Sequence, residues 1–121
     1  MIIGIDFDGT CVRHEFPRIG KDIGAVPVLK RLVDAGHQLV LNTMRSENLL
    51  EDAVLWFKVN NIPLYGKNNT PGQLSWTKSP KVYANISIDD AALGCPLKID
   101  DEGYKYVDWE IVEKMLFGDN K

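Results

Sequence analysis

Two carboxylates, spaced two residues apart, follow a short apolar segment near the start of the chain. Residues 2–5 are Ile-Ile-Gly-Ile, and the polar run that follows contains Asp6, Asp8, Gly9 and Thr10. A carboxylate at the end of a buried strand is costly unless it is paired or binds a metal. Mg²⁺ prefers carboxylate oxygens and keeps positions open for water and phosphate. The pair therefore predicts a Mg²⁺ site, and the alternative is a strand that runs into an ordinary Asp-Gly turn.

A second acid pair, Asp89 and Asp90, follows a second apolar segment at 82–88. Short apolar runs of this kind are typical of strands in parallel sheets, where both faces are covered. Two acid pairs at the ends of two such strands can converge on one metal ion. The sequence leaves open which of the two acids binds the metal directly, and a simple turn after the strand is the alternative interpretation.

A hydroxyl residue, Thr43, comes directly after a third apolar segment at 38–42. Ligands of open α/β sheets bind beyond the carboxyl ends of the strands, so this hydroxyl is placed to bond a phosphate oxygen. The alternative is a helix cap, because Ser46 and Glu47 open a helical pattern. Arg45 either orients the substrate or pairs with an acid, and the sequence does not decide between the two.

Two polar segments are expected to form loops. Residues 11–20 are too polar and too broken for a helix, so we expect a loop or small hairpin over the end of the first strand. His14 is its best candidate for contact with a substrate phosphate, because the proton of a histidine can move near neutral pH; solvated loop charge is the alternative. Residues 66–80 are rich in Gly, Asn, Pro, Ser and Thr, and their role is left open.

Hydrophobic periodicity predicts the elements that position these residues. Helices are expected from a cap at Asp22 to Gly36, from 47 to 59, and from 109 to about 117 after a cap at Asp108. A strand, a helix and a strand of these lengths form a parallel βαβ unit, which indicates an α/β fold. The expected strands are 2–5, 38–42, 63–65, 82–88 and an edge strand at 96–99.

Composition limits the classes of function. The chain has 121 residues, 45% of them hydrophobic and 26% charged, which predicts a single globular domain over 1–121. A net charge of −3 gives no excess of positive charge for general nucleic-acid binding. It does not exclude a nucleotide or a terminal phosphate of a nucleic acid as the substrate. The two cysteines, Cys11 and Cys95, have no metal-like spacing, which favours a reducing cytoplasmic setting. No segment has the length of a membrane span or the layout of a signal peptide.

Three motifs resemble those of the haloacid dehalogenase-like (HAD) hydrolases, most of which are phosphatases. Residues 6–10, Asp-Phe-Asp-Gly-Thr, resemble the nucleophile motif of that family. Residues 41–45, Leu-Asn-Thr-Met-Arg, resemble its second motif, an apolar strand that ends in Ser or Thr. Lys81, followed after seven residues by Asp89 and Asp90, resembles the fused third and fourth motifs. The three motifs together span residues 6 to 90. Their combination in this order is specific, although each motif alone is not.

The resemblance implies a fold. The family forms a three-layer Rossmann-like sandwich with a mainly parallel five-stranded sheet in the order 5-4-1-2-3. That order would place Asp6, Thr43 and Asp89 on three neighbouring strands. The intervals after the first and second motifs are too short for a cap domain. Capless members of the family act on large substrates or use a partner subunit as the lid, so a homo-oligomer that closes the site is an expectation.

The resemblance also implies a mechanism. Asp6 would attack phosphorus, and Asp8 would act as general acid and then as general base. Asp6, the main-chain carbonyl of Asp8 and one or both of Asp89 and Asp90 would hold Mg²⁺.

Further residues would contact the substrate, a phosphorylated small molecule or the phosphorylated end of a macromolecule. Thr43 and Lys81 would clamp the transferring phosphoryl oxygens, with Lys78 as a competing lysine. We also expect Gly9, Thr10, His14 and Arg45 at the substrate.

A different class of protein remains an alternative. Receiver domains of response regulators have a similar length and also use acids, Thr or Ser, and Lys. Their acid pair precedes the acceptor Asp, whereas here the acceptor-like Asp6 comes first and the pair Asp89-Asp90 comes last. A catalytically silent binding module on the same fold is a further alternative, and it would leave the complete motif set unexplained.

Overall fold

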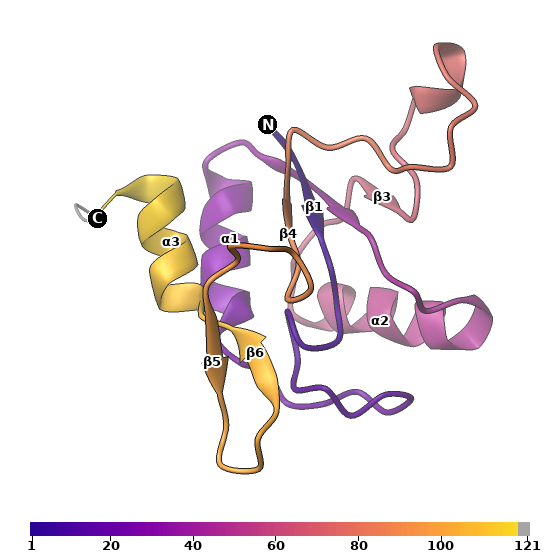
Figure 1. Cartoon of the computed structure of the whole chain (residues 1–121). Coiled ribbons are helices and arrows are strands. Elements are labelled where there is room, and N and C mark those ends of the chain that lie inside the picture. Colours follow the sequence, from indigo (N-terminus) through magenta and orange to yellow (C-terminus); the bar gives the residue numbers. More distant parts are fainter. Residues whose placement is uncertain (119–121) are drawn as a thin grey trace.

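The computed structural model describes residues 1–118 of the chain (Figure 1). Three α-helices, six short strands and one 3-10 turn alternate along it. In chain order they are β1 (Ile2–Ile5), α1 (Ala25–Asp34), β2 (Gln38–Leu41), α2 (Glu47–Val59), β3 (Gly66–Lys67), the 3-10 turn η1 (Gln73–Ser75), β4 (Ile86–Ile88), β5 (Leu97–Ile99), β6 (Lys105–Val107) and α3 (Trp109–Phe117).

Four strands form one parallel sheet in the order β3-β2-β1-β4. Ile5 of β1 lies opposite Leu41 of β2 and Ile88 of β4, so the three strands end at the same level. The predicted α/β class, with a parallel sheet flanked by helices, is confirmed and is consistent with a Rossmann-like sandwich. The order also agrees with the expected neighbours of the first strand.

The prediction that residues 96–99 add a fifth strand to this sheet is wrong. Residues 97–99 pair with β6 instead, in a separate antiparallel hairpin. The cause is the acidic turn between the two strands, in which Gly103 N donates to Asp100 O at 3.0 Å. A turn this tight folds the chain directly back, so β5 finds its partner in β6 and does not extend the parallel sheet.

Two strands also differ from their expected bounds. Pairing with β2 begins where Tyr65 N donates to Leu39 O, so β3 follows the segment 63–65 that was expected to form it. Residues 82–85 do not join β4, because loop side chains take their backbone groups. Tyr83 N donates to the side chain of Gln73, and Tyr83 O accepts from the hydroxyl of Thr70.

The helix signals were accurate. Asp22 Oδ1 accepts a hydrogen bond from Ala25 N at 3.0 Å, and Asp108 Oδ1 accepts one from Ile111 N at 3.3 Å. Asp108 is the N-cap residue of α3, as predicted. The N-cap position of α1 is Gly24, and Asp22 accepts from the first N–H groups of that helix from two residues before it. The helices α2 and α3 also have the bounds that periodicity indicated.

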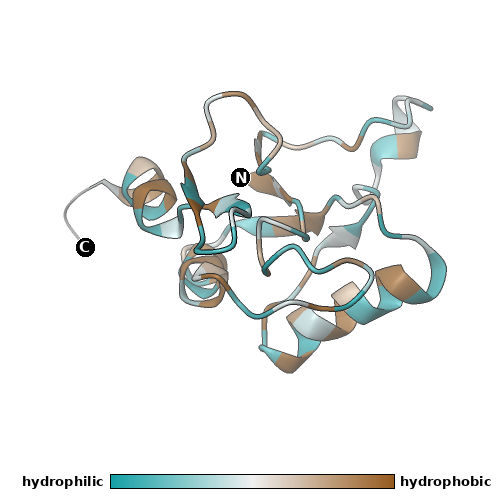
Figure 2. Ribbon diagram, turned by 60° about the horizontal axis from the view of Figure 1, so that its bottom comes forward, coloured by the Kyte–Doolittle hydropathy of each residue, from teal (hydrophilic) through white to brown (hydrophobic). Residues whose placement is uncertain are grey.

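One apolar core joins the sheet to all three helices, and the central strands are correspondingly hydrophobic in Figure 2. Alternate strand positions point into this core, as expected for period-two side chains. Its members include Ile3, Ile5, Leu39, Leu41 and Ile88 from the strands, with Leu29, Leu32, Ala53, Phe57, Trp109 and Val112 from the helices. The indole of Trp109 also donates to Thr10 O at 2.6 Å, which ties α3 to the loop after β1.

Among the residues that the structure describes, no helix combines the length and the apolar character needed to cross a membrane.

Candidate active site

The two acid pairs meet at the carboxyl edge of the sheet. Asp6 follows β1, Asp89 and Asp90 follow β4, and Asp6 N donates to Ile88 O at 3.0 Å between the two strand ends. Carboxylate oxygens of Asp6, Asp89 and Asp90 all lie within 4.8 Å of one another. The predicted convergence of the acids is therefore confirmed, and these three side chains are called the acid cluster below.

Thr10 holds two members of the acid cluster in place. Its buried hydroxyl donates to Asp6 Oδ2 at 2.8 Å and accepts from Asp90 N at 3.1 Å. The same hydroxyl lies 3.3 Å from Asp90 Oδ1. The sequence interpretation placed Thr10 at the substrate, but in the structure its hydroxyl bonds the acids themselves.

Gly9 leaves room for the Asp90 carboxylate. The backbone of Gly9 has a φ of +81°, and a Cβ at this position would lie 2.5 Å from Asp90 Oδ2. Its N–H donates to Val12 O at 2.8 Å and its carbonyl accepts from Val107 N, so both polar groups are used within the protein. Gly9 therefore shapes the acid cluster and offers no hydrogen-bonding group to the substrate position that the sequence interpretation assigned to it.

Within residues 1–118, no basic side chain forms an ion pair with the acid cluster. The pKa of Asp6 is raised from 3.8 to about 8, first by burial, then by a hydrogen bond with Asp90 and by the negative charge of Asp89; the hydroxyl of Thr10 opposes this rise. Three carboxylates brought together in a partly buried place favour a bound cation, which would let Asp6 ionise.

The acid cluster is close enough to share one metal ion. One carboxylate oxygen from each of Asp6, Asp89 and Asp90 lies within 4.8 Å of the other two. The three residues could therefore hold a metal ion after rotation of their side chains.

Asp8 is not a member of the acid cluster, because its carboxylate forms an ion pair with Arg45. Arg45 Nε donates to Asp8 Oδ2 and Arg45 Nη2 donates to Asp8 Oδ1, each at 2.8 Å. The remaining N–H groups of this buried guanidinium donate to the carbonyls of Pro17, Arg18 and Leu49. Of the two roles that the sequence left open, the structure shows pairing with an acid, and it leaves no guanidinium nitrogen without a protein partner.

Thr43 keeps its hydroxyl hydrogen available. Arg45 N donates to Thr43 Oγ1 at 3.1 Å, which uses the hydroxyl as an acceptor. Thr43 N donates to the side-chain oxygen of Asn68 at 2.8 Å, which fixes this end of β2. The hydroxyl can therefore donate to a ligand in the pocket beside it.

A pocket of about 420 Å³ contains these groups. Its wall includes the side chain of His14, which is exposed, so the structure brings His14 to the place that the sequence interpretation predicted. The full set of residues around it is Asp6, Asp8, His14, Phe16, Thr43, Met44, Arg45, Asp89, Asp90 and Ala91.

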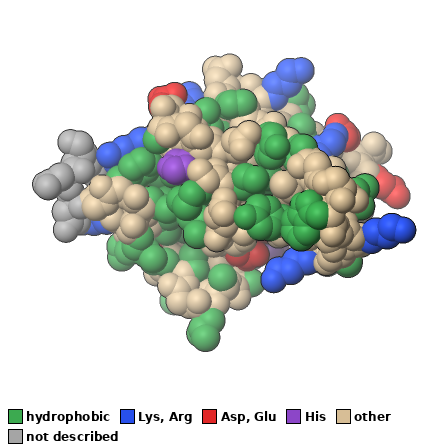
Figure 3. All heavy atoms as spheres, turned by 90° about the horizontal axis from the view of Figure 1, so that it is seen from above, with side chains coloured by type: hydrophobic (Ala, Val, Ile, Leu, Met, Phe, Trp, Pro, Cys, Tyr) green, Lys and Arg blue, Asp and Glu red, His purple; other side chains and the backbone are tan. Residues whose placement is uncertain are grey.

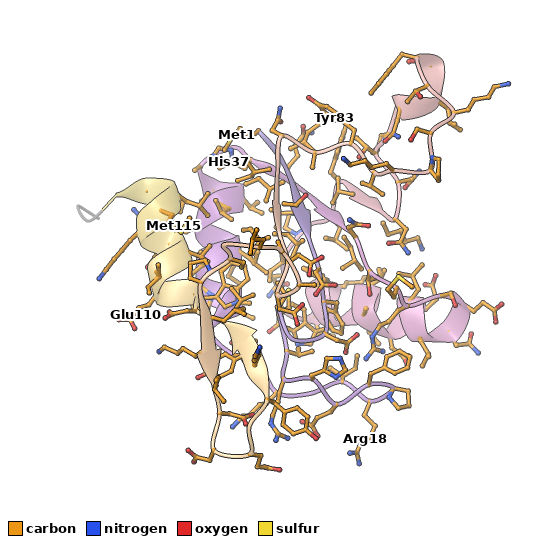
Figure 4. The ribbon with its side chains drawn as sticks, viewed as in Figure 1. Met1, Arg18, His37, Tyr83, Glu110 and Met115 are labelled. Atoms are coloured by element: carbon orange, nitrogen blue, oxygen red, sulfur yellow. The ribbon has the colours of Figure 1, made fainter. Side chains whose placement is uncertain are left out.

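The structure does not place Lys81, expected to clamp the phosphoryl oxygens, or Lys78 among the residues that line this pocket. Asn85 N donates to Ile2 O, so the residues before β4 lie at the amino edge of the sheet, opposite the acids. Figure 4 shows Tyr83 near Met1 at that edge, with Arg18 at the other end of the molecule. Figure 3 views the amino edge from above, where hydrophobic side chains gather and Lys and Arg side chains lie scattered around the margin. The physical reason is that eight residues of extended chain span roughly 26 Å, so a lysine before a strand is remote from acids after it.

Sequence reasoning missed two groups at the carboxyl edge. Lys67 ends β3 opposite Leu41 of β2, and its Nζ lies 3.1 Å from Glu51 Oε1. Asn68 follows directly after β3. The sequence could have indicated both residues. A third strand assigned two residues later than 63–65 would have put Lys67 and Asn68 at this edge. Phe16 and Met44, which also line the pocket, had no chemical pattern that marked them.

The fold and this site define an α/β protein with an acid cluster at the carboxyl edge of a parallel sheet. No protein-family model and no curated protein matches the chain. A solved structure that resembles it is that of a conserved protein from Bacteroides thetaiotaomicron, with 34% sequence identity and a TM-score of 0.81. The alignment covers 100% of this chain and 93% of that one. The chain therefore belongs to the family of this conserved Bacteroides protein.

Proposed function

We propose that this chain is a Mg²⁺-dependent phosphomonoester hydrolase of the HAD type, which works through an aspartyl-phosphate on Asp6. The observation that carries the proposal is the separation of the two acids of the first motif. Asp6 belongs to the acid cluster, whereas Asp8, two residues further on, is held by Arg45. In this proposal Asp6 binds the metal ion and the phosphoryl group, and Asp8 transfers protons.

The proposed reaction has two steps. An oxygen of Asp6 forms a bond to phosphorus while the ester P–O bond breaks. Asp8 first takes up a proton from solvent in the pocket and then gives that proton to the leaving alcohol oxygen. A water molecule then attacks phosphorus, Asp8 takes a proton from it, and the bond between phosphorus and the Asp6 oxygen breaks. The products are an alcohol and inorganic phosphate, and both carboxyl groups return to their starting states.

Arg45 supports this role of Asp8 by orientation. Its two hydrogen bonds use one lone pair on each carboxylate oxygen, and each oxygen keeps a second lone pair. Asp8 lines the same pocket as Asp6, so a free lone pair of its carboxylate can carry the proton that passes to the leaving group or comes from the attacking water. The hydroxyl of Thr43 would donate to a phosphoryl oxygen.

The side chains of Asp6, Asp89 and Asp90 would hold Mg²⁺, together with the main-chain carbonyl of Asp8. When bound, the ion supplies positive charge that offsets the charge on the phosphoryl oxygens. The raised pKa of Asp6 supports this assignment, because a carboxyl group with a pKa of about 8 is mostly protonated at neutral pH and needs a nearby cation to become a nucleophile.

The test is phosphate release from p-nitrophenyl phosphate and a panel of nucleotides, sugar phosphates and phosphorylated oligonucleotides, with and without Mg²⁺. We expect Mg²⁺-dependent multiple turnover that is lost in Asp6→Asn and kept in Asp101→Asn, an exposed acid in the turn between β5 and β6. Transfer of a single phosphoryl group per chain would instead favour the receiver-type alternative. Turnover that is indifferent to a chelator would refute the metal site.

A further inference from the structure

Two apolar side chains stand exposed at the mouth of the acidic pocket. Phe16 is 50% exposed and Met44 is 98% exposed, and both line the pocket that contains Asp6 and Asp8. An exposed apolar residue is ordinary on a protein surface when it stands alone. Here two of them lie beside a group of four carboxylates and form an apolar rim around a charged centre. Such a site can bind the charged end of a ligand through electrostatic contacts and its other end through apolar contacts.

The Phe16 ring is held in place without any ligand. The guanidinium carbon of Arg45 lies 5.1 Å from the centre of this ring, and 5.1 Å from the centre of the buried ring of Phe7. Arg45 also donates to the carbonyls of Pro17 and Arg18, the two residues that follow Phe16. The ring therefore rests on a buried cation with half of its surface free, as a preorganised platform for a flat group.

The rest of the pocket wall offers little to a ligand rich in hydroxyl groups. Of the described residues that line it, none is Asn, Gln, Ser, Tyr or Lys. The guanidinium of Arg45 is already bonded to protein partners, which leaves Thr43 and His14 as the side chains that can donate a hydrogen bond. The hydroxyl groups of a sugar would therefore meet Phe16 and Met44 at the rim in place of polar partners, whereas an apolar ring gains contact area there.

We infer that the site selects phosphomonoesters whose organic part presents a flat, apolar face near the phosphate, such as an aryl or base-like ring, over polyhydroxylated phosphates. This inference rests on the proposed function for the phosphate end of the ligand. Phe16 supplies the face for the ring, Met44 covers its edge with an adaptable side chain, and the acids with their cation hold the phosphate.

Binding of two phosphonates tests the inference apart from catalysis, because a phosphonate has no ester bond to break. The pair is 2-phenylethylphosphonate and 2-hydroxyethylphosphonate, titrated calorimetrically into the full chain with Mg²⁺. We expect tighter binding of the phenyl compound, by about tenfold. In Phe16→Ser this preference should fall by about 3- to 10-fold, the size of one aromatic contact, with little change in affinity for the hydroxyl compound.

Two further variants make the result decisive. Met44→Ser alters a side chain that is almost fully exposed, so it should fold normally and still weaken the preference. Leu74→Ser alters an exposed residue of η1 that is outside the pocket, and it should keep the wild-type preference. Equal affinity for both phosphonates, or a preference unchanged in both pocket variants, would overturn the inference. A clear preference without turnover of any ester would support it and refute the proposed hydrolase.

Discussion

Arg45 holds both carboxylate oxygens of Asp8, with Nε–Oδ2 and Nη2–Oδ1 distances of 2.8 Å each. The guanidinium comes from the segment after β2, 37 residues away in the chain, and is buried between two phenylalanine rings. The pair gives Asp8 a charge partner, whereas residues 1–118 form no ion pair with Asp6, Asp89 or Asp90. In the proposed mechanism a cation therefore binds at the acid cluster, and Asp8 transfers protons.

Replacing Arg45 should damage both stability and chemistry. In Arg45→Lys the ammonium group cannot make the two parallel hydrogen bonds to Asp8 or bond three carbonyls at once. We expect the free energy of unfolding to fall by about 3 kcal/mol, as for other broken buried pairs. We also expect kcat to fall by at least about tenfold while KM changes little, because Asp8 acts in the transition state.

Arg31→Lys is the matched control for this change. Arg31 is partly exposed and pairs with Glu113 at 3.2 Å, so its replacement should cost about 1 kcal/mol or less. Urea unfolding and steady-state kinetics measure both variants. Equal effects of the two substitutions on kcat would show that Arg45 does not act through Asp8.

The stability of the metal-free chain should depend on pH through Asp6. The pKa of Asp6 is 3.8 in the reference state and about 8 in the fold, so the native state keeps a proton that the unfolded chain loses. Stability from this group is complete below about pH 4, falls by up to about 1.4 kcal/mol per pH unit above it, and levels off above about pH 8. Urea unfolding in a chelator at pH 5, 6, 7 and 8 measures the slope.

Asp6→Asn is the comparison that isolates this effect from those of other titrating groups. Asp100, whose pKa is lowered by its hydrogen bond with Arg13, changes stability with the opposite sign and only below about pH 4. The variant should lose the downward slope between pH 5 and pH 8. The same slope in the variant and the wild-type chain would place the titrating group elsewhere.

Gly9 should be required for the acid cluster, for steric reasons. Both Gly9 and Gly94 have a positive φ, of +81° and +89°, so alanine at either position strains the backbone by roughly 1–2 kcal/mol. Only at Gly9 would the new methyl group meet the Asp90 carboxylate, whereas nothing lies within 4 Å of a Cβ at Gly94. Both variants should therefore lose some thermal stability, and Gly9→Ala should also lose most of the rise in Tm that Mg²⁺ produces in the wild-type chain. A full Mg²⁺ response in Gly9→Ala would argue that Asp90 does not bind the ion.

The acid cluster could be predicted from the sequence because each acid pair directly follows a short apolar run. Adjacent parallel strands end at one edge, so Asp6 and Asp89 had to come close once β1 and β4 were neighbours. The helix caps at Asp22 and Asp108 were predictable for a similar reason, since a cap depends only on local spacing.

Features that depend on long-range packing could not be predicted in this way. The pair between Asp8 and Arg45 requires the path of the chain between β2 and α2, and no local pattern encodes it. The prediction of a fifth strand in the parallel sheet was wrong because β5 pairs with β6 in a local hairpin and not with the edge of that sheet. The motif resemblance placed Lys81 at the site, although a residue that precedes a strand lies at the edge of the sheet opposite the acids that follow that strand.

The corrected position of Lys81 predicts which lysine matters for the substrate. Lys67 ends β3 at the carboxyl edge, level with Leu41 of β2, and its contact with Glu51 is an exposed ion pair that costs little to break. A lysine there can swing toward a phosphate two strands away, whereas Lys81 lies beyond the other edge. We expect Lys67→Met to raise KM for a phosphomonoester by about tenfold and Lys81→Met to leave it unchanged, with unaltered folding in both. Steady-state kinetics on the best substrate of the phosphatase panel provide the measurement, and a larger effect of Lys81→Met would mean that the loop before β4 reaches the site.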